Sequence, residues 1–259
     1  MPDAQNDSKS VQAIDRAFMI LETVAENGSM SLNDLFVNLG INKASLLRAA
    51  MALCSNGYLQ RDAKTGDYSL STKTFEIGVK AFRSLDYIGL IKSELEALSE
   101  ELCVVAQYSI ESENELLCLE SFDRKNNSGF SIYTRVGSRS PLYSTSAGKA
   151  ILSTYPNDEI LNKWEKMNVK AITPNTILTY EGLMQDIAKI RLRNYALDME
   201  ENEPGLFCIG TVLLNYNRKP IGAISLSTDS MSKEDELRFS GALLRSTQKI
   251  SSMLGYTCR

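Results

Sequence analysis

The sequence of 259 residues contains no histidine. Ser-His-Asp and Cys-His nucleophilic sites, HExxH metal sites and histidine general acid-base catalysis are therefore excluded, because each requires an imidazole. An enzyme with this sequence would need a different set of catalytic groups.

The cysteines do not form a pattern typical of a disulfide framework or of a zinc site. They are odd in number, widely spaced and free of any CxxC pair. We therefore expect no metal site, and we expect reduced, mostly buried thiols at Cys54, Cys103, Cys118, Cys208 and Cys258.

Long apolar runs are also missing. No stretch approaches the roughly 18 apolar residues that span a bilayer. The polar N-terminus lacks the charged and then apolar pattern of a secretory signal. We therefore expect a cytoplasmic protein without a membrane partner.

The sequence has no complete nucleotide-binding loop. The segment SAGKA resembles part of a phosphate-binding loop, but Tyr143 stands where the first glycine is needed and Ala150 replaces the magnesium-binding Ser or Thr. No GxGxxG motif follows a predicted strand, so a dinucleotide site is not expected either. The sequence predicts no cofactor.

What the sequence does contain is an ordinary globular composition with a local excess of positive charge. Hydrophobic residues make up 43% and charged residues 23%, which allows a substantial core, and the length is compatible with two domains. The net charge is -4. Residues 41–66 nevertheless carry one acidic residue, Asp62, against the basic residues Lys43, Arg48, Arg61 and Lys64, as a nucleic-acid surface would.

The region before and into this patch predicts two helices. The first carries one apolar stripe and ends near Gly28, because apolar residues recur every three or four positions at Val11, Ile14, Phe18, Leu21 and Ala25. Ser31 is a candidate N-cap of the second helix, with Asp34 three residues later. Gly40 ends that helix.

A third helix is predicted over residues 42–56, with Asn42 as its cap. Two short helices about a glycine turn are the signature of a helix-turn-helix motif. We assign its buried side to Leu46, Leu47, Ala50, Leu53 and Cys54. The opposite side is expected to enter the major groove of DNA, since small side chains permit close approach, and consists of Ser45, Arg48, Ala49 and Ala52.

DNA contacts are expected from this helix and from a hairpin that follows it. Arg48 can reach a base edge or a phosphate, and Lys43 can reach a phosphate from the first turn. Residues 58–61 and 67–70 predict a two-stranded wing whose basic residues can contact phosphates. The predicted DNA-contacting residues are Ser31, Asn42, Lys43, Ala44, Ser45, Arg48, Ala49, Arg61 and Lys64.

The remaining sequence predicts a helical connector and an α+β sheet domain. Helical periodicity continues through residues 75–82 and 88–102. Strand-like runs then alternate with helical ones. The strands are expected at 104–110, 116–122, 130–136, 195–199, 207–214 and 221–227, and the helices at 146–154, 180–194 and 233–254.

These elements predict a domain organisation. We expect a disordered tail over residues 1–9 and a winged helix-turn-helix domain over residues 10–72. A helical linker over residues 73–90 then leads to the sheet domain over residues 91–259.

Several segments resemble the IclR family of transcription regulators, in the family's order. SVQAIDRAFMILE resembles its first helix, and LGINKASLLRAAMALCSNGYLQRD resembles its turn, recognition helix and first wing strand. The later segments PLYSTSAGKAILS, ITPNTIL, YALDMEENEPGLFC and PIGAISLS resemble blocks of its effector domain. The sequence departs from the family at Ala44 and Ser45, where a Ser-Thr pair and often a histidine are usual, which leaves the operator sequence open.

The resemblance implies a C-terminal GAF-like domain with an antiparallel sheet, which binds an effector. The absence of basic side chains among the matched positions suggests a small neutral-to-acidic compound, such as an organic acid or a sugar acid. It implies a regulator that acts as a homodimer, or a dimer of dimers, on a double-stranded DNA operator. Repressors are more usual in the family than activators, and the sequence leaves the sign of regulation open. A carboxylate could dock on the free N–H groups of a helix that starts near Ser146. The positions that match the family's ligand contacts are Ile132, Ser146, Ala147, Asp198, Leu206, Cys208, Ser225 and Ser227.

Two other functions remain open at this point. One is a metabolite-binding module without DNA activity, since the set of basic residues is short. The other is an enzyme with Cys208 as nucleophile or Asp198 as base. The segment around Cys208, PGLFCIG, is apolar, which raises the pKa of a thiol and so opposes the enzyme hypothesis.

Overall fold

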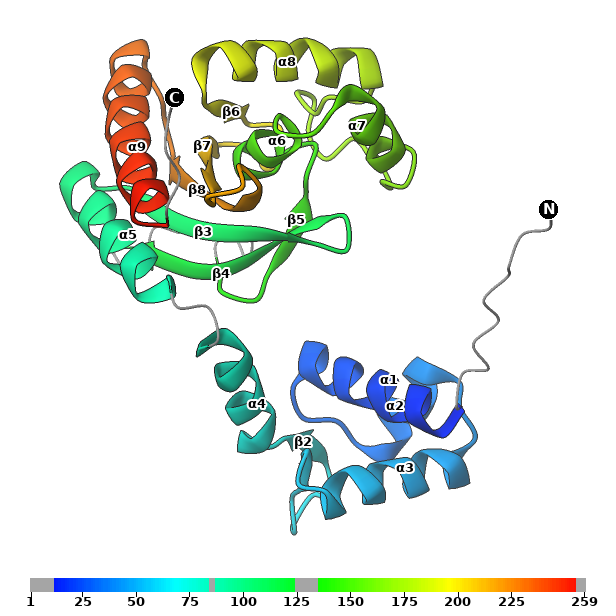
Figure 1. The fold of residues 1–259 in the computed structure, drawn as a ribbon. Helices are drawn as coiled ribbons and strands as arrows, with labels where there is room; N and C mark the ends of the chain where they lie inside the picture. Colours follow the sequence, from blue (N-terminus) through cyan, green and yellow to red (C-terminus); the bar gives the residue numbers. More distant parts are fainter. Residues whose placement is uncertain (1–11, 84–86, 124–134, 255–259) are drawn as a thin grey trace. The chain divides into compact units, whose positions relative to one another are not determined.

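The computed structural model describes residues 12–83, 87–123 and 135–254. The chain divides into two compact units, one ending at Asp86 and the other beginning at Tyr87 (Figure 1). No helix in the described ranges combines the length and the apolar character that crossing a bilayer demands.

The first unit contains three helices, a small hairpin and a fourth helix. The elements are α1 (Gln12–Asn27), α2 (Leu32–Leu39), α3 (Lys43–Ser55), β1 (Leu59–Arg61), β2 (Tyr68–Leu70) and α4 (Thr72–Arg83). Strands β1 and β2 pair antiparallel, with Gln60 opposite Ser69. The predicted helix-turn-helix and its wing are confirmed.

The ends of α2 and α3 are set by the residues that the sequence marks. The Ser31 hydroxyl accepts a hydrogen bond from the backbone N–H of Asp34, and the Asp34 carboxylate accepts one from the backbone N–H of Ser31. Gly40 ends α2 with a φ of 62°, in the left-handed region that favours glycine. The Asn42 Oδ1 then caps α3 by accepting from the N–H of Ala44 at 2.9 Å. Local side-chain chemistry thus fixes the turn.

The packing of α1 differs from the prediction. Its predicted stripe contains Ile14 and Phe18, yet these side chains are 51% and 57% exposed. Ile20 and Val24 are buried instead, in the core of the unit. Because α1 carries apolar residues on two sides, periodicity alone does not select the side that packs.

The second unit is a six-stranded sheet with helices. Its strands lie in the order β5-β4-β3-β8-β7-β6, and each neighbouring pair is antiparallel. This confirms the α+β class. The elements are α5 (Ile88–Leu102), β3 (Val105–Ser112), β4 (Glu115–Asp123), β5 (Arg139–Pro141), α6 (Ser146–Leu152), α7 (Asn157–Trp164), α8 (Tyr180–Arg193), β6 (Ala196–Met199), β7 (Phe207–Leu214), β8 (Pro220–Thr228) and α9 (Lys233–Met253).

Two elements of this unit differ from the prediction. The strand expected at 130–136 lies mostly outside the described residues, and residues 135 and 136 form a bend and a turn. Strand β5 begins only at Arg139. Helix α7 was not predicted, because its eight residues bury a single side chain, Ile160, and so lack a recognisable apolar stripe.

The helices cover both faces of the sheet (Figure 1). Helices α5 and α9 lie side by side, with α5 against β3 and β4 and α9 against β7 and β8. Helix α6 packs on the other face, and α8 packs against α6. Side chains alternate along a strand, so Ser225 and Ser227 of β8 face α6 while Leu226 faces the opposite layer.

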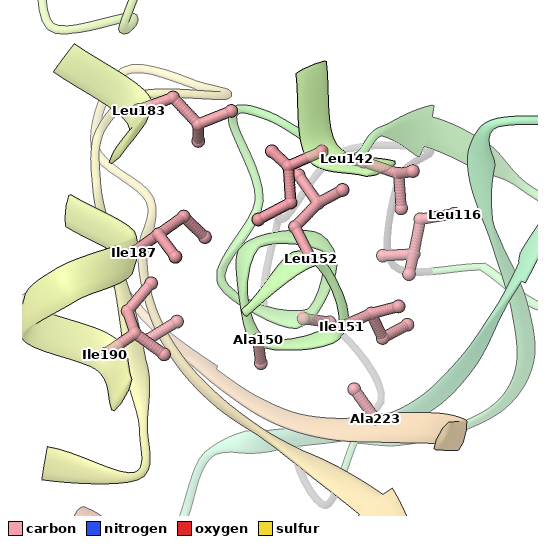
Figure 2. Close-up of a cluster of buried hydrophobic side chains, with 12 residues drawn as sticks. Leu116, Leu142, Ala150, Ile151, Leu152, Leu183, Ile187, Ile190 and Ala223 are labelled. Atoms are coloured by element: carbon pink, nitrogen blue, oxygen red, sulfur yellow. The ribbon is translucent and has the colours of Figure 1, made fainter. Parts of the chain in front are cut away.

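Helix α6 lies at the centre of the core on its face of the sheet (Figure 2). All seven of its residues are buried. Leu183, Ile187 and Ile190 of α8 approach from one side at helical spacing, while Leu142 and Leu116 lie on the other side. Such close surroundings leave little volume for added atoms.

Gly148 shows how closely α6 is packed. A Cβ atom at this position would lie 2.4 Å from the carbonyl oxygen of Leu142 and 2.5 Å from its Cα. Both neighbours are backbone atoms, which cannot rotate away. Only glycine therefore fits without moving the segment before α6.

We predict that Gly148→Ala lowers the free energy of unfolding by about 1–3 kcal/mol through overpacking. The matched change is Gly241→Ala in α9, where the new Cβ meets only the Arg245 side chain, at 3.4 Å. It should raise the free energy of unfolding by about 0.5–1 kcal/mol through helix propensity. Urea unfolding of the full chain measures both, and the reverse order would contradict the packing described for α6.

Candidate functional site

Helix α3 has one side in the core and one side in solvent. Leu46, Ala50 and Leu53 are buried. The exposed side is formed by residues spaced at i, i+4, i+7 and i+11. We call this the open side of α3, and it consists of Ala44, Arg48, Met51 and Ser55.

The open side is rotated from the side that the sequence predicted. Leu47 was predicted to be buried, but it is 37% exposed. Ser45 and Ala49 were predicted to be open, but both are half-buried, and Ala49 packs against the core. Leu46 and Leu53 lie in the core of the unit and Cys54 packs against it, whereas Leu47 does not, so Met51 faces outward.

Several polar side chains near the start of α3 already make contacts within the protein. The Lys43 Nζ donates to the Asn33 Oδ1 at 2.9 Å and lies 4.9 Å from the centre of the Phe36 ring. Arg48 makes a long contact, 3.4 Å from its Nη2 to the Ser45 hydroxyl. The Ser31 hydroxyl caps α2 by accepting the backbone N–H of Asp34. Arg48 is therefore the basic side chain that extends from the open side.

The wing holds its two basic residues differently. The Arg61 Nε donates to the carbonyl oxygen of Gly66 at 3.0 Å, and its guanidinium lies 5.5 Å from the centre of the Tyr68 ring. Lys64 is exposed in the turn, where Asp62 accepts hydrogen bonds from the backbone N–H groups of Lys64 and Thr65. Arg61 thus stabilises the hairpin, and Lys64 projects from it.

In the second unit, a small cavity of about 40 Å³ lies between α6 and the sheet. Every effector residue predicted from the sequence lines it except Ile132, which lies outside the described residues. The lining residues are Gln107, Ser109, Leu116, Cys118, Ser140, Thr145, Ser146, Ala147, Asp198, Asn202, Leu206, Cys208, Ser225 and Ser227.

Half of these residues were missed by the sequence analysis, and they come from other strands and from a loop. Gln107 lies opposite Ser225 in the β3–β8 pair, so its side chain joins the same face. Ser109 follows two residues later on that face. Strand alternation could have found both, but the order of the strands could not be read from the sequence.

The backbone of β7 passes close beneath the start of α6. A Cβ atom on Gly210 would lie 2.8 Å from the backbone nitrogen of Ala147. The Thr145 hydroxyl caps α6 by accepting from the N–H of Gly148, so this cap does not use the N–H groups of Ser146 and Ala147. On the neighbouring strands, the Cys208 Sγ lies 3.2 Å from the Ser227 hydroxyl.

Asp198 is the titratable residue whose environment is most unusual in the cavity. Its side chain is 1% exposed, and burial raises the pKa of this carboxyl to about 7. Its Oδ1 accepts the backbone N–H of Glu201 at 2.7 Å, which opposes the shift without cancelling it. Asp198 therefore exchanges its proton near neutral pH.

A buried ion pair supports the loop that carries Asn202. Lys149 of α6 is fully buried, and its Nζ lies 2.5 Å from the Glu201 Oε1 and 2.8 Å from the Asp186 Oδ2. The Ser144 hydroxyl also donates to the Asn202 Oδ1 at 3.0 Å. Helix α6, helix α8 and the loop between β6 and β7 are thus joined around the cavity.

Cys208 is not an activated nucleophile. Its side chain is buried, and that burial raises the pKa of the thiol well above its usual range, with the nearby Asp198 adding to the shift. A thiol held neutral reacts slowly, because the thiolate is the nucleophile. The geometry of the cavity fits binding rather than catalysis.

Comparison with protein families identifies both units. A model of the IclR helix-turn-helix domain matches residues 13–63, and one of the bacterial transcriptional regulator IclR C-terminal domain matches residues 79–252. The chain belongs to the IclR family. It is therefore a DNA-binding transcription regulator with an effector-binding C-terminal domain, and not an enzyme.

Individual IclR relatives match over most of their length. The HTH-type transcriptional regulator KdgR of Escherichia coli is 27% identical over 256 residues, which cover 98% of this chain and 97% of KdgR. The DNA-binding transcriptional repressor YiaJ of E. coli is 29% identical over 256 residues, which cover 96% of this chain and 89% of YiaJ.

Solved structures share the fold. The Thermotoga maritima IclR structure has a TM-score of 0.78 and 25% identity, and the match covers 95% of this chain and 100% of that one. An IclR homologue from Microbacterium hydrocarbonoxydans, complexed with 4-hydroxybenzoate, has a TM-score of 0.81 and 18% identity, with 94% and 99% covered.

The raised pKa of Asp198 predicts a pH-dependent stability. A carboxyl whose pKa is higher in the folded than in the unfolded chain binds more protons when folded, so the free energy of unfolding falls as pH rises from about 4 to 7. Asp198→Asn keeps an acceptor for the Glu201 N–H and removes this titration. Between pH 5 and pH 7 the free energy of unfolding of the wild type should fall by roughly 2–3 kcal/mol more than that of the variant. Urea unfolding at each pH measures this difference, and equal slopes would contradict the assignment.

Proposed function

We propose that this IclR-family chain is a homodimeric repressor whose affinity for an operator responds to a compact organic acid or sugar-acid-like effector. The open side of α3 enters the major groove of the operator. The effector occupies the cavity between α6 and the sheet. The chemistry of the residues that line this cavity is the observation that carries the proposal.

The lining suits a small ligand rich in oxygen atoms. Hydroxyl groups predominate, joined by the amides of Gln107 and Asn202 and by the carboxyl of Asp198. None of the described lining residues is basic. Hydroxyls both donate and accept, and at or below its pKa Asp198 can donate to a ligand oxygen. A hydroxy acid or sugar acid offers both donors and acceptors to such groups.

The size of the cavity implies that binding moves its walls. Ligand pockets commonly enclose about 300–1,000 Å³, far more than the 40 Å³ enclosed here. The wall proposed to move is the loop between β6 and β7, which carries Asn202 and Leu206, and its movement requires the Lys149–Glu201 ion pair to break or to shift. An effector that separates this loop from α6 binds one state better and so shifts the population between states.

The relatives support the ligand class and the sign of regulation. The M. hydrocarbonoxydans homologue is complexed with a hydroxy acid, which has the same functional groups as the proposed effector. YiaJ is a repressor. We extend both properties to this chain as part of the proposal.

The homodimer is supported by apolar side chains in the first unit. Ile14 and Phe18 of α1 are 51% and 57% exposed, and Phe75 of α4 is 72% exposed. Ile14 and Phe18 lie one turn apart on the same side of α1, and an exposed apolar patch marks an interaction surface in soluble proteins. A two-fold dimer would bury them and would present two α3 helices to a symmetric operator.

The alternative left open by the sequence, a metabolite-binding module without DNA activity, is opposed by the match of residues 13–63 to the IclR helix-turn-helix domain. The internal engagement of Lys43 with Asn33 and of Arg61 with Gly66 reduces the number of cations available to phosphates. Binding of DNA by the purified chain is therefore the direct test of the first candidate.

We predict that Arg48→Ala weakens binding to promoter DNA by about 1–3 kcal/mol if the guanidinium reads a base. Gel retention at two salt concentrations measures the affinity, which for the wild type should fall steeply with salt. The matched control is Lys219→Ala, which removes an exposed cation from the turn between β7 and β8. Equal affinity of the Arg48 variant and the wild type would contradict the role of α3.

We predict that Ser225→Ala abolishes the effector response and leaves DNA affinity unchanged, because the two sites lie in separate units. A thermal-shift panel of glyoxylate, pyruvate, lactate, gluconate and 4-hydroxybenzoate identifies the ligand. Ser252→Ala removes an exposed hydroxyl from α9 and should respond as the wild type does. If no acid raises the melting temperature, or if the Ser225 variant responds normally, the proposed effector site is wrong.

A further inference from the structure

The open side of α3 is unusual because half of it is apolar and a further exposed apolar residue, Leu47, lies beside it. Met51 is 57% exposed, and the adjacent Leu47 is 37% exposed. Ala44 lies on the same side, one turn before Leu47 and Arg48. These residues form a continuous apolar strip beside a single guanidinium.

The charged groups of α3 cannot account for all of its sequence readout. The basic residues of this helix are Lys43 and Arg48. Lys43 is held against α2 by Asn33 and Phe36. Arg48 alone can therefore make a charged contact to a base edge from the open side, and one such contact does not specify a site of several base pairs.

Apolar side chains read a different feature of DNA. In the major groove, thymine alone among the four bases presents a methyl group, at C5. Burying a methyl group against an apolar side chain is favourable by about 0.8 kcal/mol, or roughly fourfold in affinity. Methionine is unbranched and flexible, so it can reach such a group from the helix surface.

We propose that Met51, flanked by Leu47, selects thymine through contact with its C5 methyl group, so that the preferred DNA carries a thymine at the base pair facing Met51. The inference rests on DNA binding through α3. It adds a specificity-determining residue that acts without hydrogen bonds. Arg48 then reads a neighbouring base pair or a phosphate.

The test begins with the wild-type full chain and a pool of randomised duplexes, from which the tightest binders are selected and sequenced. In the best duplex, each thymine is replaced singly by deoxyuracil, which removes only the C5 methyl group. One thymine, or a symmetry-related pair, should lose about fourfold in affinity on replacement. The other thymines should tolerate the change.

The same scan is then run on three variants. Met51→Gln keeps the length of the side chain and removes its apolar end, so the affected thymine should become insensitive to uracil. Met51→Leu remains apolar and should keep the sensitivity. Met253→Gln changes a methionine of α9 that is 63% exposed, and it should behave as the wild type.

Each outcome decides the question. A flat uracil scan of the wild type, or an unchanged sensitivity in Met51→Gln, overturns the inference while leaving DNA binding intact. Failure of the wild type to select any duplex would overturn DNA binding itself together with the inference. If Met51→Gln does not fold, as judged by circular dichroism, Met51→Ala takes its place with the same expectation.

Discussion

The buried ammonium group of Lys149 is the constraint on which the second unit depends. Its partners, Glu201 and Asp186, come from the loop between β6 and β7 and from α8. A charge in a core is costly unless it is paired, and loss of one partner leaves the others buried and uncompensated. The ion pair therefore fixes three elements at once, and the residues that follow Lys149 along α6 belong to the apolar cluster shown in Figure 2.

The geometry of the cavity follows from that constraint. Because Lys149 holds Glu201, the backbone N–H of Glu201 points at Asp198 and the loop closes over the serines of β8. Burial within the cavity raises the pKa of the Asp198 carboxyl and that of the Cys208 thiol. The side chains that shape the cavity and those that stabilise the fold are thus partly the same.

The first unit depends on local hydrogen bonds and on helix packing rather than on a buried charge. Its turn is fixed locally, by the capping box of α2, by Gly40 and by Asn42. Its reading surface is instead set by how α3 packs on the core, which turns Met51 outward and Ala49 inward. An exposed methionine beside one arginine gives a surface suited to apolar as well as charged contacts with DNA.

The sequence by itself determined the elements whose signals are local. The helix caps at Ser31 and Asn42, the turn at Gly40 and the strand at 207–214 depend on residues close together in the chain, so pattern and propensity suffice. The resemblance of ordered segments added the proposed effector residues from Asp198 to Ser227, which line one cavity. Only the tertiary structure decided which sides of α1 and α3 are buried, that Gln107 joins the cavity, and that Lys149 meets Glu201. Each of these depends on the order of strands or on the rotation of a helix against its neighbours, which is set by packing between residues distant in sequence.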